Sequence, residues 1–66
     1  MTGVEIARNI FKIAHIDYAI SSLTQLIAIT EGEELATVIN MVAKLEGIRE
    51  NIAGQTNDML GGEAIE

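Results

Sequence analysis

Residues 13–30, which read IAHIDYAISSLTQLIAIT, decide the fold. Their apolar residues recur at steps of three and four, and the series runs Ile13, Ile16, Ile20, Leu23 and Ile27, with Thr30 at its end. Because an α-helix has about 3.6 residues per turn, such steps place these side chains on one helix face. Polar residues such as Asp17 and Ser21 lie off that face. The stretch therefore predicts an amphipathic helix.

A tight turn is expected directly after this stretch, at Thr30-Glu31-Gly32-Glu33. Gly32 is the residue that adopts a left-handed conformation most easily, which is common where a helix ends. Thr30 and Glu33 have the spacing of a capping box for a new helix. Carboxylates at residues 31, 33 and 34 also favour a helix N-terminus, because they meet the positive end of the helix dipole.

A second helix is predicted from about residue 33 to residue 52. Its apolar series is Leu35, Val38, Ile39, Val42, Leu45, Ile48 and Ile52. Gly47 is discordant, because glycine costs about 1 kcal/mol against alanine within a helix. It marks either the close approach of a partner helix or a kinked C-terminal end.

The segments at the two ends are harder to interpret. Before residue 13, Ile6 and Ile10 continue the apolar stripe, while Val4, Ala7 and Phe11 form a second one. We expect a helical extension of the first helix with Thr2 as its N-cap; a separate short helix or a short strand at residues 10–13 are the alternatives. Residues 54–66 contain three glycines and predict a flexible acidic tail.

These patterns predict an all-α fold: an antiparallel helical hairpin spanning residues 1–53, with helices at about 3–30 and 33–52 joined by a turn at 30–33. A chain of 66 residues without cysteine buries only about 60% of its unfolded surface, so a lone core is marginal. We therefore expect homo-oligomerisation, most simply a dimer, to complete a four-helix-type bundle. The predicted core and oligomer interface comprises Ile13, Ile16, Ile20, Leu23, Ile27, Leu35, Val38, Ile39, Val42, Leu45 and Ile52.

The charge distribution excludes several partners. The formal net charge is −6, and all of it lies after residue 30. Binding to nucleic acids or to anionic lipids requires clustered Lys and Arg side chains, so we expect neither as a partner. The longest uncharged stretch, residues 18–30, is shorter than the roughly 20 apolar residues that span a bilayer. We expect a cytoplasmic protein.

No catalytic or metal site is expected. The single histidine, His15, cannot form a zinc site within one chain. Asp17 lies two residues away, a spacing that does not bring two side chains together on a helix. Glu31, Glu33 and Glu34 lack the alternating ligands of a calcium loop. The sequence predicts no enzyme and no cofactor.

What remains is apolar surface, which predicts a protein–protein interaction module that binds and modulates another protein, with inhibition as the expected direction. Aromatic residues and arginine often anchor interfaces, so we expect partner contact at Arg8, Phe11, Lys12 and Tyr18. In type, without shared motifs, the chain resembles small accessory proteins of bacteria and phages. The alternatives are a structural or chaperone-like subunit of a larger complex, and an acidic mimic of nucleic acid.

Overall fold

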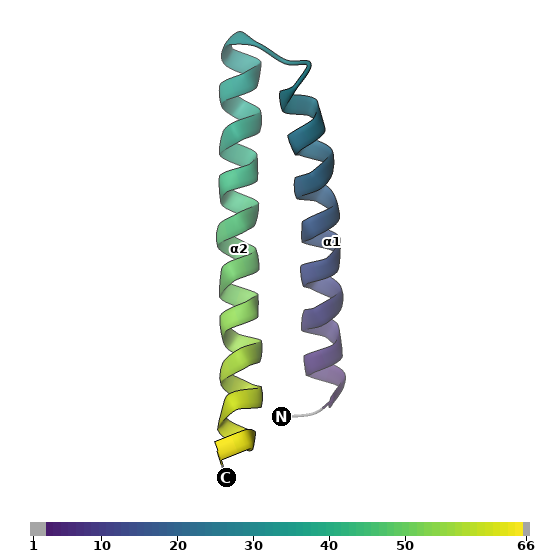
Figure 1. Ribbon diagram of the computed structural model, residues 1–66, viewed down its shortest axis with the longest axis vertical. Coiled ribbons are helices and arrows are strands. Elements are labelled where there is room, and N and C mark those ends of the chain that lie inside the picture. Colours follow the sequence, from purple (N-terminus) through teal and green to yellow (C-terminus); the bar gives the residue numbers. More distant parts are fainter. Residues whose placement is uncertain (1–2, 66) are drawn as a thin grey trace.

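Two antiparallel helices form a hairpin, with the turn at one end and the free ends of both helices toward the other (Figure 1). The computed structural model describes residues 3–65, with side chains as far as Asp58. Helix α1 spans Gly3–Ile27 and helix α2 spans Gly32–Ile65, and the described residues contain no strand. The predicted all-α hairpin is confirmed. Because α1 is continuous from Gly3, the N-terminal residues extend the first helix, while the predicted N-cap Thr2 lies outside the described residues.

Helix α1 ends three residues before the predicted boundary at residue 30, because its last turn tightens. The amides of Ala28, Ile29 and Thr30 each donate to the carbonyl three residues earlier, at 3.2, 3.1 and 3.4 Å. Such bonds use carbonyls that have no partner within the helix. The Thr30 hydroxyl also donates to the carbonyl of Leu26, so this side chain caps the end of α1.

Gly32 makes the reversal between the helices possible. It has a φ of +69°, and every other described residue has a negative φ. The predicted left-handed conformation is confirmed, although it occurs at the first residue of α2. A side chain there costs about 1 kcal/mol, because Cβ approaches the following carbonyl oxygen.

A seam of residues spaced alternately three and four apart joins the helices. In α1 it comprises Ile6, Asn9, Ile13, Ile16, Ile20, Leu23 and Ile27, and in α2 Leu35, Val38, Val42, Leu45, Arg49, Ile52 and Thr56. All of these residues are buried or half-buried. A mean spacing of 3.5 is the repeat of coiled coils, in which such residues interdigitate.

One polar pair sets the register of the seam. The Asn9 side-chain amide donates to the Thr56 hydroxyl at 3.1 Å, and that hydroxyl donates to the Ile52 carbonyl at 2.8 Å. Thr56 is only 6% exposed, so its hydroxyl needs these partners. With residue 9 opposite residue 56 in antiparallel helices, residue 16 lies opposite 49 and residue 27 opposite 38.

Helix α2 runs well beyond the predicted end at residue 52. It continues to Ile65, through most of the segment for which the sequence predicts a flexible tail; residue 66 lies outside the described residues. Glycine weakens a helix because of its backbone entropy, and Gly54 falls in this segment. The seam nevertheless extends to Thr56, whose bond to Asn9 supports the helix from outside the segment.

Two glycine substitutions test this fold in opposite directions. Gly32→Ala is expected to lower the free energy of unfolding by about 1 kcal/mol, because alanine is strained at positive φ. Gly47→Ala is expected to raise it by up to about 1 kcal/mol, because an added Cβ meets nothing within 4 Å and alanine favours helix. Urea unfolding followed by circular dichroism measures both. Equal effects of the two substitutions would contradict the assigned turn.

Candidate protein-interaction surface

Nine large apolar side chains of the described residues are exposed to solvent. Val38 is the single buried apolar residue among those described, at 7% exposure. The exposed ones range from 40% to 83%: Val4, Ile10, Phe11, Tyr18, Leu26, Ile29, Ile39, Met41 and Ile48. Scattered single apolar residues are normal on a protein surface, but a contiguous set marks an interaction site.

The overall dimensions agree with this excess of surface. The accessible area is 5009 Å², whereas a compact monomer of this mass is expected to expose about 4,100 Å². The radius of gyration is 15.3 Å, against about 11 Å for a globular chain of this length. The molecule measures 51 × 15 × 12 Å, so it is a thin rod with no interior to hold a larger core.

An open groove lies between the helices, beside the N-terminal half of α1 and the middle of α2. Five residues of α1 line it, namely Arg8, Phe11, Lys12, His15 and Ile16, and Ile48 and Ile52 of α2 complete it. Its volume is about 520 Å³. The isoleucines make the lining largely apolar, and we expect the cationic heads of Arg8 and Lys12 at its rim, because long charged side chains cover apolar surface with their stems and keep their heads in water. The groove therefore fits an apolar segment with acidic residues beside it.

The same flank continues as apolar surface toward the turn. Residues seven apart lie on the same side of a helix, since seven residues make almost two turns. From Lys12 this spacing leads along α1 to Ala19 and Leu26, and from Ile48 it leads along α2 to Met41 and Glu34. We call this side of the hairpin the apolar flank: Arg8, Phe11, Lys12, His15, Leu26, Glu34, Met41 and Ile48.

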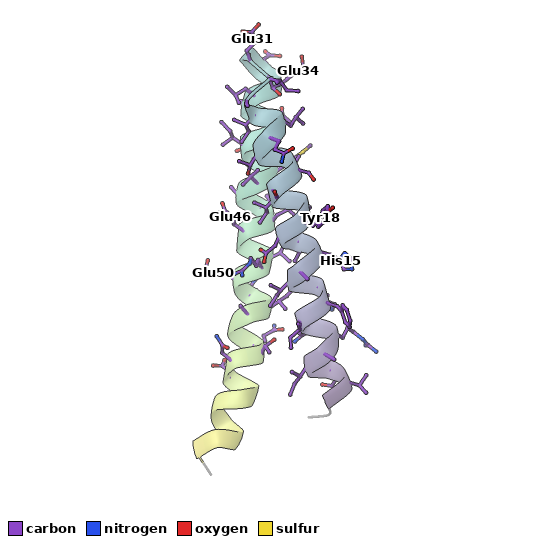
Figure 2. All side chains as sticks on the ribbon, turned by 45° about the vertical axis from the view of Figure 1, so that its right-hand side comes forward. His15, Tyr18, Glu31, Glu34, Glu46 and Glu50 are labelled. Carbon is purple, nitrogen blue, oxygen red and sulfur yellow. The ribbon has the colours of Figure 1, made fainter. Side chains whose placement is uncertain are left out.

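The opposite side of the hairpin is charged. Arg49 Nε donates to Asp17 Oδ1 at 2.5 Å, and a second guanidinium nitrogen lies 3.4 Å from Oδ2. The hydrogen bond to Asp17, and then its negative charge, raise the pKa of Arg49. Glu46 and Glu50 flank this pair, on the edge of the hairpin away from His15 and Tyr18 (Figure 2). We call this side the acidic flank.

The structure separates the four predicted partner-contact residues into two groups. Arg8, Phe11 and Lys12 lie together in the groove. Tyr18 lies outside the lining, is 78% exposed and points away from α2 (Figure 2).

Ten of the eleven predicted core residues lie on the seam, whereas Ile39 lies beside it and is 49% exposed. Asn9, Arg49 and Thr56 were missed as seam residues; the signal that finds them is the alternation of three and four, which continues through polar positions.

Nothing in the described part of the chain suggests bound metal or buried reactive groups. No group of three or more His, Asp or Glu residues there is arranged to hold a metal ion. Every buried side-chain polar atom among the described residues has a hydrogen-bond partner. Among the described residues, no helix has the length and apolar character needed to cross a membrane. The described surface offers apolar side chains and charged groups.

Comparison with protein-family models, with curated proteins and with solved structures finds no match to this chain.

Removing the ion pair on the acidic flank is expected to cost little. Asp17→Asn should lower the free energy of unfolding by at most about 1 kcal/mol, because both side chains are about half exposed. The loss should vanish in 1 M salt, which screens exposed charges. Urea unfolding at low and high salt measures it, with Glu50→Gln as the control. A larger or salt-independent loss would show that the pair holds the hairpin together.

Proposed function

We propose that this chain is a small, non-enzymatic protein–protein interaction module of the cytoplasm. In this proposal it self-associates as a helical hairpin and then binds and modulates another protein, with inhibition as the expected direction. The observation that carries the proposal is the set of large apolar side chains exposed on both helices, while Val38 is the single buried apolar residue among those described. Burial of such surface is the main driving force of protein association.

Self-association is supported by the apolar flank. Two hairpins packed flank to flank form a four-helix-type bundle, in which neighbouring helices cross at about 20°. The bundle would cover Ile48 and Met41, each close to half exposed in the single chain. A dimer is the simplest closed assembly of this kind.

A second surface remains for the partner protein. Val4, Phe11 and Tyr18 are spaced seven apart along α1, so they share its outer face; Phe11 also borders the apolar flank, which leaves Val4 and Tyr18 for the partner. Val4 and Phe11 are each 66% exposed, and Tyr18 is the most exposed of the three. Tyr18 points away from α2 (Figure 2), so a copy packed on the apolar flank leaves it accessible. Tyrosine is also enriched among residues that dominate binding energy.

Site-specific photo-crosslinking in the cells that produce the protein tests this proposal. A benzophenone amino acid at position 18 should crosslink a discrete foreign protein, because Tyr18 stands on the proposed partner face. The same probe at position 50, on the acidic flank, is the matched control and should not capture that protein. Mass spectrometry identifies the products. The absence of any foreign product at position 18, or the same products at both positions, would contradict the proposal.

A further inference from the structure

The two ends of the apolar flank carry opposite charges. Near the free end of α1 stand the exposed cations Arg8 and Lys12, together with the single carboxylate of Glu5, seven residues before Lys12. At the turn stand the exposed carboxylates Glu31 and Glu34 (Figure 2), with Glu33 between them in sequence. The apolar residues of the flank lie between these two ends, so the surface has a direction.

We propose that a second copy of this chain occupies the apolar flank with its turn at the opposite end, which places Arg8 and Lys12 of each copy against Glu31 and Glu34 of the other. This inference rests on the proposed self-association and specifies its geometry. Charge complementarity selects the orientation, because apolar contact by itself favours neither direction.

The parallel arrangement is disfavoured by repulsion. It would bring the two turns together, with three carboxylates from each copy at one end of the bundle. The cations Arg8 and Lys12 of both copies would then lie together at the other end of the bundle. Like charges placed face to face across an interface are a strong barrier to the wrong pairing.

The acidic flank is a poor alternative site for the second copy. Asp17 and Arg49 are already paired with each other there. Two copies joined by this flank would bring Glu46 and Glu50 of one against the same residues of the other. Packing through the apolar flank does not place these carboxylates against each other. The cations Arg8 and Lys12 of that flank have the opposite charge to the carboxylates at the turn of the other copy.

Apolar matching agrees with the reversed orientation. Turning one copy end for end brings the Phe11 end of its flank toward Leu26 of the other copy, and these residues are 66% and 40% exposed. Met41 and Ile48 are seven residues apart on α2 and lie on either side of the midpoint of the dimer interface. Met41 of each copy therefore faces Ile48 of the other. The pairing uses the same surface on both copies, so it closes as a dimer.

Charge reversal tests the orientation. The variant Arg8→Glu with Lys12→Glu should raise the dimer dissociation constant on the order of 10-fold, because each exposed pair becomes repulsive and occurs twice in the dimer. Adding Glu31→Lys and Glu34→Lys to the same chain should restore the dissociation constant of the unmodified protein. Sedimentation equilibrium at low salt measures both, and circular dichroism checks that the variants remain helical.

A matched control separates the ion pairs from net charge. The reversal at residues 8 and 12 lowers the net charge from −6 by four, and the rescue returns it to −6. Combining the same reversal with Glu46→Lys and Glu50→Lys also returns the net charge to −6, but on the acidic flank. This control should not rescue the dimer. Equal rescue by both combinations, or an unchanged dissociation constant in the first variant, would overturn the proposed orientation.

Spin-label distances give a second readout that does not depend on charge. Ser21→Cys and Ala14→Cys place labels seven residues apart on one face of α1, in a chain that has no cysteine of its own. In the reversed dimer, moving the label from position 21 to position 14, away from the turn, should lengthen the axial separation between copies by about 20 Å, since each label moves about 10 Å in opposite directions. Nearly equal distances would show a parallel dimer and overturn the orientation alone, whereas a monomer at every concentration would overturn the proposed self-association itself.

Discussion

The seam between two helices can bury only one face of each, and the rest of this molecule follows from that constraint. The seam is regular, yet Val38 is the single buried apolar residue among those described. A rod only 15 × 12 Å in cross-section has no second layer to cover its remaining apolar side chains. Because small domains are stable only when they bury enough apolar surface, the exposed flank of this hairpin is the physical reason to expect a protein upon it.

The polar members of the seam explain why this hairpin has one register. Leu, Ile and Val pack acceptably in several registers, so a seam made only of them specifies position weakly. The bond from Asn9 to Thr56 and the pair between Arg49 and Asp17 each join one residue of α1 to one of α2. A slip along the seam would break both, and the buried Thr56 would lose one of its partners.

Much of this fold can be predicted from sequence, because the evidence is local. Steps of three and four predict both helices, and Gly32 marks the reversal. The length of α2 is not predictable in this way, since its glycines oppose helix locally while support comes from Asn9, far away in sequence. The candidate site divides similarly: Arg8, Phe11 and Lys12 meet because of their spacing on one helix. Whether Ile48 and Ile52 lie next to them depends on the register between the helices. Polar residues set that register, and a search for apolar periodicity does not find them.

The proposed dimer depends on one contact, in which another copy of the chain covers the exposed apolar flank. Sedimentation equilibrium of the unmodified protein over a wide dilution series tests it most directly. We expect a particle of about twice the 7.1 kDa chain mass that dissociates only at high dilution. A monomer at every concentration would contradict self-association, and would mean that the missing half of the core belongs to a different protein.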